Sequence, residues 1–141
     1  MSKFNFKASD IQMSEAEETR MLEEALSIYS KNSTAQGRSL KQIVDSTSQG
    51  HLAEISLIQS HGFINDPRKY MDVRSPSGIA VEVKTSKYKN IDIVLEKMAE
   101  RKSWARVANW IFYYLVEEDQ YTLKETYKWD GKSFLPAEWE E

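Results

Sequence analysis

The clearest pattern of hydrophobic and polar positions lies at residues 79–84, where most odd positions hold Ile or Val. A period of two is typical of a β-strand with one buried face, and the other face here carries Glu82 and Lys84. Residues 75–78 read Ser-Pro-Ser-Gly, in which Pro fixes φ and Gly tolerates a positive φ. The pattern therefore predicts a β-hairpin over residues 70–86.

A short polar lead at residues 1–10 precedes the first predicted helix, which runs to about residue 31. The helix opens with a capping box, Ser-Glu-Ala-Glu, at residues 14–17. Its apolar stripe suits a helix packed on the core or one paired with a second copy of the chain, and we expect both uses. The stripe consists of Met21, Leu22, Ala25, Leu26 and Tyr29. After the helix, polar residues 32–38 form a linker.

Two further helices flank the predicted hairpin. A second capping box opens a helix at Ser39, but residues 45–50 are poor in helix formers and predict a break. Helical periodicity resumes over residues 51–61, and this segment carries Glu54. The last predicted helix spans residues 92–104.

The remaining strands are predicted after these helices. Residues 107–116 are rich in aromatic and β-branched side chains without alternation, which indicates a central strand buried on both faces. Residues 121–129 form a further strand, and Asp-Gly at 130–131 is a strong turn signal before a short strand at 134–135. Residues 136–141 form an acidic tail. This order predicts an α/β fold with a mixed central sheet and flanking helices.

Length and composition narrow the class of protein. A chain of 141 residues with 40% hydrophobic content suits one globular domain, residues 1–141. It contains no Cys, which excludes disulfides, thiolate metal sites and a cysteine nucleophile. No apolar run approaches the ~18 residues of a membrane span, and residues 1–7 lack the apolar stretch of a signal peptide. We expect a cytoplasmic protein without a membrane partner.

The net charge of −3 is unevenly distributed along the chain. Residues 67–106 hold ten Lys or Arg and five acidic residues, a net charge of +5. Residues 117–141 hold three Lys and eight acidic residues, a net charge of −5. A basic middle segment is where a phosphate backbone would be attracted, so this distribution favours nucleic acid as a partner.

The predicted hairpin also carries candidate metal ligands. If Asp72 and Glu82 are cross-strand neighbours, their side chains lie roughly 5 Å apart, with Lys84 beside them. Two carboxylates at that distance repel each other unless a cation lies between them. Mg²⁺, which takes oxygen ligands and keeps several waters, suits this gap.

The spacing of Asp72, Glu82, Val83 and Lys84 resembles that of the PD-(D/E)XK nuclease superfamily. The resemblance implies a restriction-endonuclease-like core with Asp72 and Glu82 as ligands of Mg²⁺, for which Mn²⁺ substitutes. It further implies a ligand from the carbonyl of Val83, a water-positioning role for Lys84, and a further catalytic ligand from Glu54. Residues 1–38 would then be an N-terminal helix and linker with a role in dimerisation, and residues 39–135 the catalytic core.

Other polar residues near the hairpin have two interpretations each. Arg74 shares the face of Asp72 and is a candidate DNA contact or an exposed ion-pair partner. The loop that follows the hairpin carries Ser86, Lys87 and Lys89, which are candidates for phosphate contact or part of a solvated connection. His51, one of two histidines, is expected on a helix surface rather than in a metal site.

The resulting hypothesis is a Mg²⁺-dependent DNA endonuclease that acts as a homodimer. A compact chain suits either a structure-directed enzyme, such as a Holliday-junction resolvase, or a small type II restriction enzyme. The alternatives are a non-catalytic DNA-binding or assembly protein with a nuclease-like fold, and an adaptor that uses its first helix.

Overall fold

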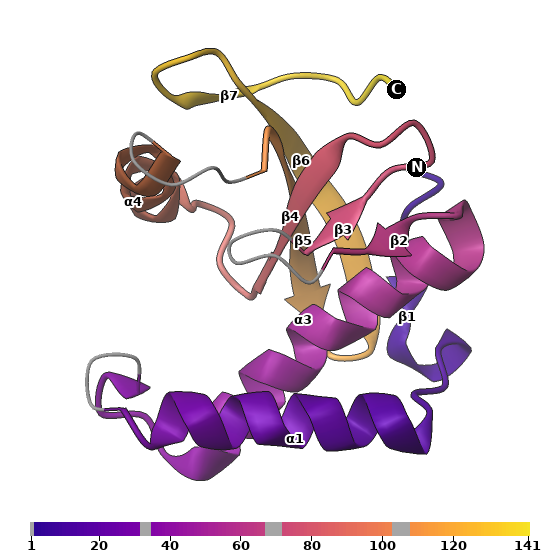
Figure 1. Cartoon of the computed structure of the whole chain (residues 1–141), viewed down its shortest axis with the longest axis vertical. Coiled ribbons are helices and arrows are strands. Elements are labelled where there is room, and N and C mark those ends of the chain that lie inside the picture. The colour runs from indigo at the N-terminus through magenta and orange to yellow at the C-terminus, as the bar shows by residue number, and fades with distance from the viewer. Residues whose placement is uncertain (1, 32–34, 67–71, 103–107) are drawn as a thin grey trace.

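The computed structural model describes residues 2–31, 35–66, 72–102 and 108–141. Within these residues the chain has a mixed α/β fold, in which a curled sheet of seven strands is accompanied by three α-helices (Figure 1). The predicted α/β class with a mixed sheet is therefore confirmed. No helix in the described ranges combines the length and the apolar character needed to cross a membrane.

The sheet has the strand order β1-β6-β5-β4-β3-β2, and β7 pairs with the free part of β6. Among the described strands, β4 and β5 pair in parallel, and the other neighbours are antiparallel. The helices are α1 (Glu15–Tyr29), α3 (Leu40–His61) and α4 (Asp92–Lys102), with a short 3-10 helix, η1 (Ala8–Asp10). The strands are β1 (Phe6–Lys7), β2 (Ile64–Asn65), β3 (Val73–Arg74), β4 (Ala80–Ser86), β5 (Trp110–Glu117), β6 (Gln120–Trp129) and β7 (Phe134–Pro136).

Helices cover both faces of the sheet, and each face has its own core. On one face, Ala53 and Leu57 of α3 pack with Val81, Val83 and Phe112. On the other face, α4 packs against alternate residues of β5 (Figure 1). Because both faces are covered, seven consecutive residues of β5, 110–116, are buried. The predicted central strand is thus confirmed, and it begins at Trp110.

The predicted turn of the hairpin is confirmed. Gly78 has φ +93°, which a side-chain-bearing residue rarely adopts, and its N–H donates to the carbonyl of Ser75 at 2.8 Å. β3 and β4 pair on either side of this turn. The first strand of the hairpin is shorter than predicted within the described residues, and the segment 70–71 lies outside them.

The predicted helix break at residues 45–50 is wrong, because α3 runs without interruption from Leu40 to His61. Tertiary packing explains the difference: Ile43, Thr47 and His51 are all buried along this part of the helix. Packing of that kind overrides the weak helix propensity of Ser, Thr and Gly. The helix ends at His61, as predicted, and Gly62 follows it in a left-handed conformation with φ +72°.

Both ends of the chain belong to the core, which corrects the predicted polar lead and acidic tail. Phe4 and Phe6 are buried in the core beneath α3. Near the other end, Trp139 contacts the rings of Trp110 and Phe112, with ring centroids 4.9 Å apart in each pair. Aromatic burial therefore outweighs the polar surroundings of these residues.

The apolar stripe of α1 is only partly used within the described chain. Met21 and Ala25 are buried, whereas Leu22, Leu26 and Tyr29 are 42%, 54% and 47% exposed. One side of the helix therefore packs on α3, and the other side presents apolar side chains to the surface.

Candidate functional site

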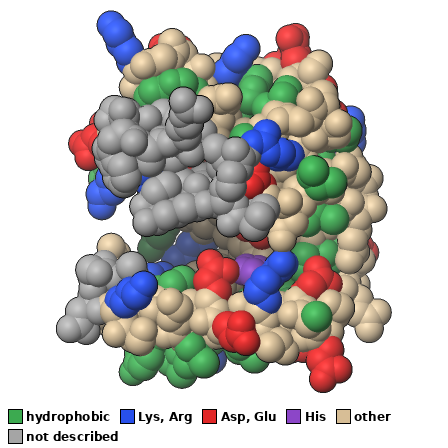
Figure 2. Space-filling model, in the orientation of Figure 1, with side chains coloured by type: hydrophobic (Ala, Val, Ile, Leu, Met, Phe, Trp, Pro, Cys, Tyr) green, Lys and Arg blue, Asp and Glu red, His purple; other side chains and the backbone are tan. Residues whose placement is uncertain are grey.

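A cavity of about 380 Å³ lies where α1, α3 and β4 meet. Five charged side chains line it: Glu24, Glu54, Asp72, Glu82 and Lys84. Figure 2 shows this side of the molecule hollowed between α1 and the sheet, with acidic, basic and histidine side chains at the hollow. The structure therefore brings the four predicted side-chain candidates, Glu54 among them, into one cavity.

The register of the hairpin places Asp72 opposite Glu82. Val73 pairs with Val81, so the preceding residue faces the following one across the strands. The N–H of Asp72 donates to the carbonyl of Val81 at 3.2 Å. The Asp72 carboxylate accepts the N–H of Val83 at 2.7 Å, which fixes the carboxylate at the point where β3 separates from β4.

Glu54 comes from α3, and its carboxyl group is a neighbour of the Asp72 carboxyl group in the cavity. Burial and the nearby carboxylates of Asp72 and Glu24 raise the pKa of Glu54 to about 9. Burial also raises the pKa of Asp72 to about 6, although the N–H of Val83 opposes this rise. Two buried carboxyl groups in contact cannot both be ionised cheaply, so at neutral pH they retain a proton on Glu54.

Glu82 is also buried, with 6% of its side chain exposed, and two cations neutralise it. Arg101 of α4 donates through Nη2 to Oε2 of Glu82 at 2.6 Å. Lys84 lies on the same strand face, with Nζ 3.4 Å from Oε1 of Glu82. Glu82 therefore binds basic side chains in this structure, whereas Asp72 and Glu54 bind each other.

His51 is buried in α3, which corrects its predicted position on a helix surface. Its Nε2 lies 2.5 Å from Oε2 of Glu24, and this contact joins α3 to α1 at the cavity mouth. The hydrogen bond to His51 lowers the pKa of Glu24. Helix α1 thus contributes the carboxylate of Glu24 to the cavity. This contact is separate from the predicted role of the helix in dimerisation.

The candidate DNA contacts are placed around the hairpin. Arg74 Nε lies 2.8 Å from Asp66 Oδ2, and Arg74 Nη1 donates to the carbonyl of Gly78, so the ion-pair alternative describes it here. The Ser86 hydroxyl accepts the N–H of Tyr88. Lys87 and Lys89 are exposed beyond the end of β4.

The donor chemistry of the cavity suits a hard divalent cation. Carboxylate oxygens are the ligands that Mg²⁺ and Mn²⁺ take in proteins, and the Glu54–Asp72 pair presents two carboxyl groups in contact. Within the described ranges, however, no group of three or more Asp, Glu or His side chains is arranged to hold a metal ion. The pairing of Glu82 with Arg101 and Lys84 agrees with that finding.

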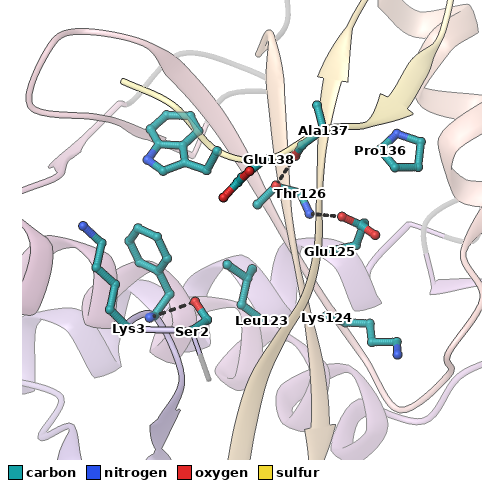
Figure 3. Close-up of a pocket in the computed structure, with 11 residues that line it drawn as sticks. Ser2, Lys3, Leu123, Lys124, Glu125, Thr126, Pro136, Ala137 and Glu138 are labelled. Atoms are coloured by element: carbon teal, nitrogen blue, oxygen red, sulfur yellow. Dashed lines mark hydrogen bonds between the residues drawn. The ribbon is translucent and has the colours of Figure 1, made fainter.

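A larger cavity, of about 650 Å³, lies between the N-terminal segment, β6 and the C-terminal segment (Figure 3). Three hydrogen bonds are drawn there, and the one between Thr126 and Ala137 joins β6 to the C-terminal segment. The Thr126 hydroxyl donates to the carbonyl of Ala137, and the Thr126 N–H donates to the carboxylate of Glu125. None of the predicted site residues lines this cavity.

Sequence reasoning missed three contributors to the site: Glu24, His51 and Arg101. Glu24 and His51 lie on separate helices, and only the packing of α1 on α3 brings them together. Arg101 falls in a Glu-Arg-Lys run that is typical of a solvated helix face. The available signal was its position one helical turn after Met98, which is buried on the sheet side of α4.

No protein-family model, curated protein or solved structure matches this chain. The resemblance of Asp72, Glu82 and Lys84 to PD-(D/E)XK nucleases therefore stays a prediction from the sequence, and the structure adds that the three residues line one cavity.

Proposed function

We propose that this protein is a metal-dependent DNA endonuclease with a restriction-endonuclease-like core. The observation that carries the proposal is the shared cavity of Glu54, Asp72, Glu82 and Lys84. Three carboxylates and a lysine converge from a helix and both strands of a hairpin, as the resemblance implies. The mixed sheet with helices on both faces agrees with such a core.

Glu54 and Asp72 would hold the metal ion, with Glu82 joining them once its carboxylate leaves Arg101. A bound Mg²⁺ or Mn²⁺ supplies a water of lowered pKa and neutralises charge that builds on the phosphate. The fixed Asp72 carboxylate needs no rearrangement to act as a ligand, because the Val83 N–H already orients it. In the same proposal, the carbonyl of Val83 is a further ligand.

Lys84 would orient the attacking water and stabilise developing negative charge. Its Nζ lies 3.4 Å from Oε1 of Glu82, which holds a positive charge at the wall of the cavity. Orientation and charge stabilisation are therefore the roles that its surroundings support.

DNA is the proposed substrate because residues 67–106 carry a net charge of +5. Lys87, Lys89 and Ser86 extend from the end of β4 and would contact phosphates near the cavity. A homodimer, with one site for each DNA strand, and a cytoplasmic location belong to the same proposal. The substrate is either a branched junction or a short duplex sequence.

The test is a cleavage assay on supercoiled plasmid and a four-way junction, with Mg²⁺, Mn²⁺ or EDTA. We expect metal-dependent cutting by the wild type and by the control Glu23→Gln, and at least a hundredfold loss in Asp72→Asn. The preferred substrate would separate a resolvase from a restriction enzyme. Equal cutting by Asp72→Asn, or no cutting by the wild type, would refute the proposal.

One observation favours a second candidate, a non-catalytic DNA-binding or assembly protein. The pairing of Glu82 with Arg101 and Lys84 neutralises a ligand that catalysis requires. Tight DNA binding without cutting under every metal condition would establish this alternative.

A further inference from the structure

An exposed aromatic side chain lies in the connection between β4 and α4. Tyr88 is 64% exposed, the largest exposed fraction of any aromatic residue in the described ranges. A single exposed apolar residue is ordinary on a protein surface, so exposure alone assigns no role to this ring. The charges beside Tyr88 and its position next to the cavity supply the further evidence.

Lysines flank Tyr88 on both sides. Lys87 and Lys89 are exposed, and residues 85–91 contain no Asp or Glu, so this connection has a net charge of +2 in a chain whose net charge is −3. The Nζ of Lys87 lies 5.6 Å from the centroid of the Tyr88 ring. A flat ring with ammonium groups beside it matches a nucleotide, because the base stacks on the ring and the lysines neutralise phosphates.

The connection begins at the edge of the cavity. Lys84 and Thr85 line the cavity together with Glu24 and Ile28 of α1, so the end of β4 lies where α1 meets the sheet (Figure 1). Tyr88 follows Thr85 by three residues, which is at most about 11 Å along an extended chain. A nucleotide next to one bound at the cavity is therefore within reach of the ring.

Local hydrogen bonds hold this connection at both ends. The N–H of Tyr88 donates to Oγ of Ser86 at 3.0 Å, and the N–H of Asp92 donates to Oδ1 of Asn90 at 2.9 Å. Between them, Ile91 is buried in the core under α4. A ring carried by a held backbone loses less conformational entropy when it binds than one on an unstructured segment.

Stacking on a protein ring requires a base whose face is free. Inside a duplex each base is paired and stacks on its neighbours, so a surface tyrosine reaches a base only where the strand is unpaired. Every base has such a face, so this contact tolerates any sequence.

We propose that Tyr88 stacks on an unpaired base beside the cavity, so that the substrate is DNA with a single-stranded segment. This inference rests on the proposed function, because it takes DNA as the substrate from it. It decides between the two substrates given there, in favour of branched DNA over an intact duplex. Lys87 and Lys89 hold the phosphates on either side of the stacked nucleotide.

The experiment measures binding by fluorescence anisotropy in EDTA, with a labelled single strand and with the same strand as a duplex. EDTA removes divalent cations, so binding is measured without cleavage. The variants are Tyr88→Ala, Tyr88→Phe, Lys87→Gln and the control Ile93→Ala, which removes a non-aromatic side chain that is 69% exposed on α4. Circular dichroism of each variant checks that it is folded.

Tyr88→Ala should bind the single strand at least fivefold more weakly than the wild type, with less than a twofold change on the duplex. Tyr88→Phe keeps the ring and should bind both within twofold of the wild type. Lys87→Gln should reduce the slope of log affinity against log salt by about 0.7 on the single strand. Ile93→Ala should leave both affinities unchanged.

Equal affinities of the wild type and Tyr88→Ala for the single strand would overturn the inference. So would equal losses on single strand and duplex, or a loss in Tyr88→Phe as large as that in Tyr88→Ala. Binding of a labelled poly-glutamate peptide that depends on Tyr88, without binding of the single strand, would assign the connection to an acidic protein partner and overturn it too.

The same measurements separate this inference from the nuclease proposal. Metal-dependent cleavage by the wild type together with any of the contradicting results would leave the nuclease proposal standing and remove only the role of Tyr88. The expected affinities in a wild type that cuts no DNA would support the stacking and refute the nuclease activity.

Discussion

At the scale of single residues, the Glu54–Asp72 pair is electrostatically unfavourable when no metal is bound. The two buried carboxyl groups are neighbours, and burial raises the pKa of both. Such a pair favours a proton or a metal ion between its members over two bare charges. Keeping a proton on a carboxyl group at neutral pH costs folding free energy, and such perturbed groups cluster at functional sites.

This pair makes the metal-free protein less stable as pH rises. The folded state holds the Glu54 proton up to a pKa of about 9, whereas the unfolded chain releases it near its ordinary value of 4.5. Between these values the folded state binds more protons, so its stability falls by up to about 1.4 kcal/mol per pH unit. Urea unfolding in EDTA from pH 5 to pH 9 measures this trend.

Glu54→Gln is the control for the pH effect, because the amide cannot ionise. Its stability should change less with pH than that of the wild type, and it should exceed the wild type at pH 8. A wild-type stability that rises over the same range would contradict the assigned protonation.

Lys84 carries the second prediction at this scale. Lys84→Ala should lower the rate constant for cleavage at least a hundredfold, because a charge aimed at the reacting phosphate is removed. DNA affinity should change less than tenfold, since the other basic residues of the segment 67–106 would still face the phosphate backbone. Single-turnover cleavage and anisotropy measure the two effects, with Lys97→Ala as the matched control. Retained cleavage would remove Lys84 from the mechanism.

At the scale of elements, α3 is the scaffold of the site, because it carries both Glu54 and His51. Its continuity through Gly50 depends on packing rather than on propensity. A Cβ added at Gly50 would meet no atom within 4 Å, and the backbone there is helical. Gly62, at the end of the helix, has a left-handed φ of +72° instead.

These two glycines should respond oppositely to the same substitution. Gly50→Ala should raise the free energy of unfolding by about 1 kcal/mol, because alanine restricts the unfolded chain and favours helix. Gly62→Ala should lower it by about 1–2 kcal/mol, because alanine is strained at positive φ. Denaturant unfolding of both variants checks this, and destabilisation by Gly50→Ala would mean that the helix is interrupted there.

Helix α1 should have separate faces for folding and association. Leu26→Glu should convert the proposed homodimer to a monomer with little change in thermal stability, because Leu26 is 54% exposed. Ala25→Glu should lower the free energy of unfolding by several kcal/mol, because Ala25 is fully buried and a carboxylate there would lose its hydration. Sedimentation velocity and thermal unfolding measure the two effects. An unchanged mass for Leu26→Glu would remove this face from the proposed dimer interface.

Elements with strong local signals could be predicted from the sequence. The turn at Gly78 and the buried strand β5 are each specified by residues that are adjacent in the sequence. The uninterrupted α3 and the packing of Trp139 against the core could not be predicted, because they depend on contacts with distant segments. In the site, the facing positions of Asp72 and Glu82 follow from the strand register, so they could be predicted. The contact of Arg101 with Glu82 depends on how α4 packs on the sheet, so it could not.

At the scale of the whole molecule, the acidic end of the chain folds back onto the basic middle segment. The carboxylate of Glu141 accepts the N–H of Ser77 at 2.8 Å, and Trp139 is held in the core beside β5. The C-terminal residues therefore brace the turn of the hairpin. The hydrogen bond between Glu141 and Ser77 links the C-terminal segment to the hairpin that carries Asp72 and Glu82.

The central claim is that the cavity of Glu54 and Asp72 holds a divalent cation, and calorimetric titration with Mn²⁺ tests it most directly. We predict binding heat for the wild type and for Glu23→Gln, together with loss of that heat in Asp72→Asn. Folding of each variant is verified by circular dichroism. Equal Mn²⁺ binding by Asp72→Asn, or none by the wild type, would contradict the account.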